Sequence, residues 1–390
     1  MTWPASEVAK LTVNGQNFTE WESVWVQERW TESFSYFRFT ANEGRVMPDT
    51  WQELQVKPGD DCTISLGGVK VIAGTVITRQ ASYSGQQHMV QLTGKSYSFW
   101  AYKSSVFTEN GNFDGKNFVQ IADIVLGPVA AKGAIVGTPN PEPFKKAQAD
   151  KGMKIWDYLE KLAREKKIQI GSNRQGMPLF IGDHVGKIIG TVQEGDNILS
   201  CQCTITCEDL FMDINVDAQN QGDDDNSGTD ASEIHGHASS KAPRKSVLLI
   251  PMEHPPNNEN SATMRAYYEK VWTEATQITC NVTVQGWFSQ TGSLWEAGQD
   301  VMVISPMAML RDVMKIKTAT FAQDNNAGTT TTLECVAPWG LLDNINANVG
   351  TPKKSSVASG PSPNNQPTVK PATTGSPPPT TPPTTNQPTS

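Results

Sequence analysis

The six cysteines are the first candidates for chemistry in this chain of 390 residues. Cys201, Cys203 and Cys207 follow a C-x-C-x3-C spacing, and Cys280 and Cys335 fall in other candidate strands. Zinc sites favour cysteine pairs separated by two to four residues. A period of two instead places the thiols on one face of a strand, where a free cysteine packs as a small apolar side chain. We therefore expect reduced thiols packed in a core, with no disulfide framework.

Imidazoles and carboxylates form a second candidate group. The run Asp223-Asp224-Asp225 and the triplet His235-Gly236-His237 share one polar stretch, and such ligands can bind a divalent metal. The stretch contains neither H-E-x-x-H nor an EF-hand spacing. We expect a solvated loop here. A metal-dependent cell-wall hydrolase that uses residues 223–237 is an alternative.

Residues 92–96, Leu-Thr-Gly-Lys-Ser, resemble the end of a phosphate-binding P-loop. Met89 stands five residues before Gly94, where the first glycine of that motif belongs, so we expect a plain strand end. The sequence also lacks a G-x-S-x-G nucleophile motif. It therefore predicts no enzyme, no catalytic residue, no cofactor and no bound metal.

Three tryptophans near the C-terminal end are candidates for packing or recognition. Trp287 and Trp295 lie within residues 286–295, and Trp339 lies in Pro338-Trp339-Gly340. They either cover the end of a barrel or anchor an interface, where tryptophan is enriched among hot spots. The sequence leaves both roles open.

Composition and charge exclude several classes of protein. The formal net charge is −8, and residues 351–390 hold three lysines and no acid, which leaves −11 on residues 1–350. A non-specific nucleic-acid binder needs a basic face, so the balance disfavours that class. The first residues show no secretory signal, and no run of about 20 apolar residues predicts a membrane span.

The side-chain periods predict strands, then helices, then strands again. The first hundred residues alternate as a β-meander with a hairpin turn at Gly67-Gly68. Helical spacing predicts helices at 118–125 and 155–163, followed by a small hairpin of residues 168–170 and 179–181. Strands return at 198–216 and continue to about residue 342 after a helix at 262–276. We expect the polar stretch 217–260 to be irregular.

An internal similarity indicates a duplicated unit. Residues 59–64 resemble residues 298–303, and Val76-Ile77-Thr78 resembles Ile316-Lys317-Thr318. A polar loop with a glycine and then a strand follow each pair. We infer two related β-domains, with chance similarity between two meanders as the alternative.

These patterns together predict a mainly β protein with a small α/β domain, an α+β fold. The expected domains are a first β-domain at 1–105, the α/β domain at 106–190, a second β-domain at 191–342 with an insertion at 217–276, and a Pro/Thr-rich tail at 343–390. Residues 351–390 hold eleven of the 25 prolines and almost no apolar side chain. Such a segment cannot offset its ordering entropy by burial, so the tail should be disordered or extended.

Several motifs, taken in order, resemble a known family. They are Gly286-Trp287, Gly292-Ser293-Leu294-Trp295, Gly298, Val301, Val303 and Ser305-Pro306, followed by Gly328-Thr329, Thr332-Leu333 and Pro338. Over most of residues 1–342, including the helix at 156–167, the chain is similar to the baseplate hub protein of Mu-like contractile-tail bacteriophages. No counterpart in that family is identified for residues 217–260 or for the tail.

The resemblance implies a homotrimer in which each chain contributes two tail-tube-like β-barrels to a pseudo-sixfold ring. Such a hub joins the sixfold tail tube to the threefold central spike and encloses the DNA channel used in genome ejection. The implied partners are the tail tube protein, the central spike protein and other baseplate (wedge) proteins, with the tape measure protein as a further candidate. DNA would pass without specific binding, and no stable membrane insertion is implied.

The implied location is the tail baseplate of the virion, after assembly in the host cytoplasm. A hub of a related contractile injection or secretion machine is the alternative within the same class.

Overall fold

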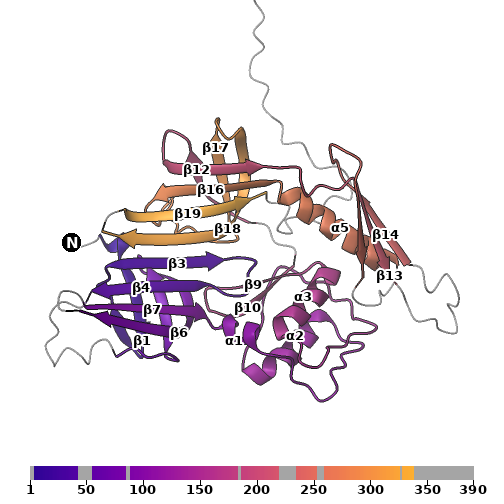
Figure 1. Ribbon diagram of the computed structural model, residues 1–390, viewed down its shortest axis with the longest axis horizontal. Helices are drawn as coiled ribbons and strands as arrows, with labels where there is room; N and C mark the ends of the chain where they lie inside the picture. Colours follow the sequence, from indigo (N-terminus) through magenta and orange to yellow (C-terminus); the bar gives the residue numbers. More distant parts are fainter. Residues whose placement is uncertain are drawn as a thin grey trace, which may run out of the picture. The chain divides into compact units, whose positions relative to one another are not determined.

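The computed structural model describes residues 4–42, 55–84, 88–182, 186–218, 234–252, 259–325 and 327–337. These residues form mostly β-strands with few helices, which confirms the expected mainly β class (Figure 1). Trp339, residues 223–225 and the expected tail at 343–390 lie outside the described residues.

Thirteen strands belong to one sheet, in the order β12-β16-β19-β18-β3-β4-β7-β6-β5-β1-β2, with β17 paired to β18 and β11 paired to β17. The indigo strand β3 therefore lies beside the orange strand β18 from the other end of the sequence (Figure 1). The bounds are β1 (Ala9–Val13), β2 (Gln16–Phe18), β3 (Ser23–Arg29), β4 (Tyr36–Asn42), β5 (Asp61–Leu66), β6 (Val69–Tyr83), β7 (His88–Ser96), β11 (Ile188–Gln193), β12 (Ile198–Ile205), β16 (Ile278–Gln285), β17 (Asp300–Ser305), β18 (Leu310–Asp324) and β19 (Gly328–Val336). A short 3-10 helix, η1 (Ala5–Glu7), precedes them.

This sheet carries the main apolar core. Its buried side chains include Phe37 and Phe39 on β4 and Phe321 on β18, and Trp287 and Trp295, from the segment between β16 and β17, belong to the same core. The expected hairpin turn is confirmed, since Gly67 and Gly68 connect β5 to β6 with φ of 53° and 83°, where L side chains are strained. Among the described strands the pairing does not return on itself to close a barrel.

A helical part with its own core lies between the two sets of sheet strands along the chain. It holds α1 (Ser98–Lys103), α2 (Phe118–Leu126), η3 (Gly127–Val129), α3 (Ile155–Lys166) and the three-stranded sheet of β8 (Ala134–Val136), β10 (Pro178–Ile181) and β9 (Gln169–Ser172). The expected helices and hairpin are confirmed. Asn117 begins α2 with a capping box to Gln120, which satisfies two otherwise free backbone N–H groups.

A second small sheet replaces much of the expected irregular stretch. Strands β13 (Asp213–Ala218), β14 (Ile234–Ser239) and β15 (Val247–Pro251) pair in the order β14-β13-β15, and α5 (Glu259–Ala275) packs on them. The prediction of irregular structure is therefore wrong for residues 234–239 and 247–251. The inward positions of β14 include Gly236 and Ala238, because α5 comes so close that a Cβ on Gly236 would lie 2.2 Å from the Ala262 carbonyl carbon.

Small residues carry little hydrophobic signal, which hid this strand from the sequence pattern. None of the helices in the described ranges has the length and apolar character needed to cross a membrane.

Candidate assembly surface

The predicted duplication is present in the structure as two matching strand triplets, β5-β6-β7 and β17-β18-β19. Both β6 and β18 have 15 residues, and both β7 and β19 have nine. The pairing of β6 with β7 shifts register between Val76 and Thr78, and the pairing of β18 with β19 shifts between Ile316 and Thr318. The two bulges thus occupy the same place in each triplet.

The turns that lead into these triplets match down to single hydrogen bonds. Gly59 N–H donates to the Val76 carbonyl at 2.8 Å, and Gly298 N–H donates to the Ile316 carbonyl at 2.7 Å. Both glycines have positive φ, 99° and 88°, which explains why the sequence pattern retains glycine there. Chance similarity between two meanders does not produce this agreement.

The agreement extends to the flanking strands. The first set runs β3-β4-β7-β6-β5-β1, and the second runs β12-β16-β19-β18-β17-β11. The outermost pairs differ, because β1 is antiparallel to β5 whereas β11 is parallel to β17. We call these the first and the second strand set.

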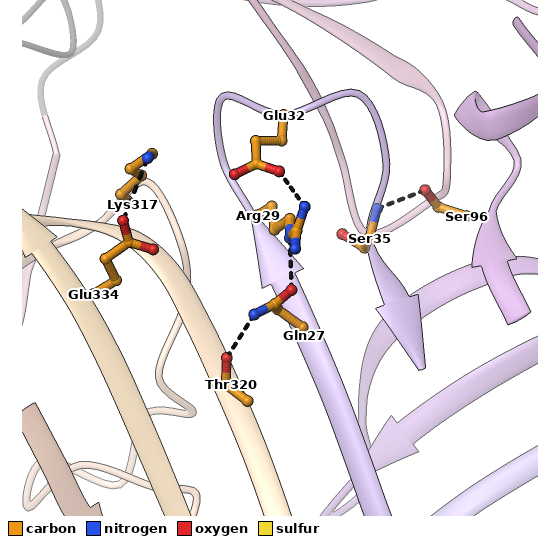
Figure 2. Close-up of polar contacts among 8 residues, drawn as sticks. All are labelled: Gln27, Arg29, Glu32, Ser35, Ser96, Lys317, Thr320 and Glu334. Atoms are coloured by element: carbon orange, nitrogen blue, oxygen red, sulfur yellow. Dashed lines mark hydrogen bonds and ion pairs between the residues drawn. The ribbon is translucent and has the colours of Figure 1, made fainter. Parts of the chain in front are cut away.

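The two sets join edge to edge through β3 and β18. Residues 23–29 pair antiparallel with residues 318–324, and the core side of this junction is fully buried at Val26 and Phe321. Figure 2 shows the polar contacts around it: the Gln27 amide donates to Thr320 Oγ1 at 3.1 Å, Arg29 donates to Gln27 and pairs with Glu32, and Lys317 pairs with Glu334. We call this pairing the internal junction.

A buried ion pair ties the helical part to both strand sets. Arg174, in the turn between β9 and β10, contacts Glu28 on β3 through two hydrogen bonds of 2.6 and 2.9 Å. The same guanidinium donates to the Trp295 carbonyl at 3.2 Å and lies 3.5 Å from Glu296. Burial by itself lowers the pKa of Arg174, but Glu28 and Glu296 outweigh it and raise that pKa above its usual value.

Besides the outer edges of β2 and β11, two strand edges of this sheet have no partner among the described strands. One is the outer edge of β12, at the end of the sheet order. The other is the outer half of β6, residues 78–83, because β5 pairs β6 only as far as Thr75. Leu199 and Ile205 on β12 are 56% and 51% exposed, and Tyr83 on β6 is 84% exposed. Exposed edges with apolar side chains are templates for pairing with another strand.

The candidate tryptophans have different positions. Trp287 and Trp295 are almost fully buried in the main core, and their indole N–H groups have no hydrogen-bond partner among the described residues. Their burial within one chain leaves them little surface for a second protein, so we propose a packing role for both. Trp339 lies outside the described residues.

The cysteines correct one expectation. Cys280 and Cys335 are buried, but Cys201 and Cys207 are exposed and Cys203 is half-buried, so the core-packing prediction is wrong for Cys201 and Cys207. Period two places Cys201 and Cys203 on one face of β12, but β12 lies at the end of the sheet, where this face is only partly covered, and Cys207 lies beyond the end of the strand.

The two histidines lie on the exposed side of β14. His235 contacts Asp217 at 2.7 Å and His237 contacts Asp213 at 3.3 Å, both across to β13. Within the described ranges, no three or more His, Cys, Asp or Glu side chains are grouped to hold a metal ion. Asp223, Asp224 and Asp225, the other residues of the hydrolase alternative, lie outside the described residues. Residues 92–96 are the end of β7, as expected.

Comparisons with known proteins agree with this architecture. Residues 8–96 match the family model "Mu phage baseplate assembly protein GpP-like, N-terminal", and residues 258–344 match the model of the fourth domain of the Mu phage baseplate assembly protein GpP. The chain is a Mu-like baseplate protein. The two models fall on the first strand set and on the C-terminal part of the second.

Solved structures share the fold of this Mu-like baseplate protein. The 43 kDa tail protein of prophage MuSo2 from Shewanella oneidensis matches with a TM-score of 0.73 and 22% identity, over 86% of this chain and 99% of that one. A tail protein from Neisseria meningitidis MC58 matches with a TM-score of 0.70 and 17% identity, over 86% and 98%.

A component of the type VI secretion system, the E. coli c3393 protein, matches with a TM-score of 0.52 and 12% identity, over 84% of this chain and 76% of that one. No curated protein sequence matches the chain.

Proposed function

We propose that this Mu-like baseplate protein is the hub of a contractile phage tail. In this role it is a structural, non-enzymatic homotrimer that adapts the sixfold tail tube to the threefold central spike. The observation that carries the proposal is the internal junction, where two matching strand sets of one chain join edge to edge. Three such chains supply six similar sets. A threefold assembly can therefore present six similar surfaces to a sixfold tube.

Each strand set would belong to one tail-tube-like β-barrel, in the domains 1–105 and 191–342, with the α/β domain 106–190 between them. A ring of six sets would surround a channel for DNA. The net charge of −11 on residues 1–350 supports this use, because an acidic wall does not retain phosphates.

The partners that fit this role are the tail tube protein, the central spike protein and neighbouring baseplate proteins in the virion. The match to a virus baseplate family supports them as a class. We propose Trp287 and Trp295 as residues that keep the second strand set packed, because both lie in the main core, in the segment between β16 and β17.

The mass of the purified protein in solution, measured by light scattering, tests the hub. We expect three times the 42.5 kDa of one chain, and images of the particle with a threefold ring of six similar lobes. A monomer at every concentration, including in the presence of the tail tube protein, would overturn the proposal.

The fold shared with the c3393 protein favours one second candidate, the hub of a related contractile secretion machine. The two candidates differ in the particle that contains the protein. Antibody labelling of purified phage particles should mark the tail baseplate if the first is right and leave the particles unmarked if the second is right.

A further inference from the structure

We propose that neighbouring copies of this chain join by pairing β12 of one copy with the outer half of β6 of the next, in the register of the internal junction. The inference rests on the proposed trimeric hub and specifies the interface that closes its ring. The occupant of the free β12 edge is therefore a second copy of the same chain.

The central strands define which residues correspond in the two sets. Leu92 of β7 is paired with Phe39, which in turn pairs with Val24 on β3. Leu333 of β19 is paired with Val282, which pairs with Cys201 on β12. Val24 and Cys201 therefore occupy the same position, and β12 is the counterpart of β3.

The same steps give the remaining correspondences. Val26 and Cys203 match two residues further along their strands. On the partner strand, Ala81 of β6 faces Val90 of β7, whereas Phe321 of β18 faces Thr331 of β19. Since Val90 and Thr331 both lie two residues before the matching leucines, Ala81 corresponds to Phe321.

The internal junction then dictates a register. It pairs Phe321 with Val26 and Thr320 with Gln27. The copied junction pairs Ala81 of one chain with Cys203 of the next, Gln80 with Thr204, and Tyr83 with Cys201. The pair of Gln80 and Thr204 repeats the Gln27–Thr320 hydrogen bond of Figure 2 with its two sides exchanged.

The exposed surface fits this pairing. Val24 and Val26 are buried in the internal junction, but their counterparts Cys201 and Cys203 are exposed and half-buried in the single chain. Ile205, in the same row, is half exposed as well. Apolar side chains on an uncovered edge strand expose apolar surface to water in a monomer. Burying that surface beneath a second strand and its core stabilises the oligomer.

The two edges also have the polarity that a ring needs. Each chain offers one β12 edge and one β6 edge, which are different surfaces, so the contact is head to tail. Head-to-tail contacts generate closed rings when the rotation between copies closes. In a closed trimer every β12 and every outer half of β6 is paired, so these edges are removed.

A cysteine introduced at Ala81 tests the register in the full chain. The variant Ala81→Cys is made together with Cys201→Ser and Cys207→Ser, so that Cys203 is the remaining partly exposed native thiol. Directly opposed residues of antiparallel strands have Cα atoms about 4.5–5.5 Å apart, which suits a disulfide. Mild oxidation should yield covalent trimers on a non-reducing gel.

The matched control is Ser82→Cys in the same background. Ser82 is the next residue of β6, and its side chain lies on the opposite face of the strand. We expect cross-linking to Cys203 at least tenfold slower than from position 81. Adding Cys203→Ser to the Ala81→Cys variant should abolish the covalent trimer.

The unmodified chain provides a second measurement that does not depend on substitutions. Cys201 and Cys203 should react with a maleimide at least tenfold more slowly in the trimer than in dilute monomer, whereas Cys207, beyond the paired segment, should react equally fast in both.

Trimers by light scattering with no cross-link from position 81, or with equal cross-linking from position 82, would refute this register and leave the hub intact. If Cys201 and Cys203 react with the maleimide as fast in the trimer as in the monomer, the β12 interface is refuted. A chain that never trimerises would refute the hub itself.

Discussion

Removing the buried ion pair between Arg174 and Glu28 should uncouple the helical part from the strand sets. The Arg174 guanidinium donates two short hydrogen bonds to the Glu28 carboxylate and one to the Trp295 carbonyl, and it lies close to Glu296. Both partners of the pair are largely buried, with 16% and 8% of their side chains exposed. Breaking one side of such a pair typically costs about 3–5 kcal/mol, because an uncompensated charge stays buried.

The magnitude follows from what each variant leaves behind. Glu28→Ala leaves the guanidinium with Glu296 at 3.5 Å, so we expect the lower end of that range, about 3 kcal/mol lost from the free energy of unfolding. Arg174→Ala leaves the Glu28 carboxylate buried and should cost a similar amount. The double variant removes both charges and should cost about 3 kcal/mol rather than about 6, a coupling of about 3 kcal/mol.

Urea unfolding of the four proteins measures this coupling. Far-ultraviolet circular dichroism and tryptophan fluorescence should give coincident transitions, so that a single free energy applies. The control is Arg29→Ala at the more exposed Arg29–Glu32 pair of Figure 2, where we expect a loss below about 1 kcal/mol. Additive single effects, with a coupling below about 0.5 kcal/mol, would refute the view that the buried Arg174–Glu28 pair couples the helical part to the strand sets.

Three other perturbations test separate parts of the molecule. Burial raises the pKa of Glu165 to about 7, so the folded state keeps a proton that the unfolded chain releases near pH 4.5. The free energy of unfolding therefore falls as the pH rises from about 4.5 to 7. In thermal unfolding, Glu165→Gln should stabilise the protein by up to about 3 kcal/mol at pH 8 and hardly at pH 4. Gly236→Val should lose about 1–3 kcal/mol and expose α5 to protease, because its Cβ meets the Ala262 backbone, whereas Ser239→Ala on the exposed end of β14 should leave cleavage unchanged. Trp287→Ala should cost about 3–5 kcal/mol in urea unfolding, but Trp287→Phe should cost far less, since no hydrogen bond of its indole is lost; equal losses would contradict the packing role.

The duplication could be predicted because its signal is local. Gly59 and Gly298 need a positive φ, which restricts the residue type, and the bulges that follow occur at fixed spacing. The helices α2 and α3 could be predicted for the same reason, because the 3.6-residue period lies within one element. Such features require no knowledge of what packs around them.

The internal junction could not be predicted in this way. It joins β3 to β18, and its Gln27–Thr320 hydrogen bond links residues 293 apart in the sequence. Alternation along β3 shows that one face is buried, but it does not identify the strand that pairs with the edge. Nor does the sequence bring Arg174 to Glu28, because the turn that holds Arg174 carries an ordinary surface pattern.

The wrong expectation for the cysteines has an instructive cause. The alternation of Cys201, Cys203 and Ile205 is typical of a strand with one buried face, and the equivalent residues of β3 are buried in this chain. A sequence pattern reflects the environment of a residue in the functional state, which for an oligomer includes the neighbouring subunits. The proposed pairing of β12 with β6 of the next copy would give these residues the environment that their pattern predicts. The protection of Cys201 and Cys203 in the trimer therefore tests the interface and also the reason for the mismatch between sequence and single chain.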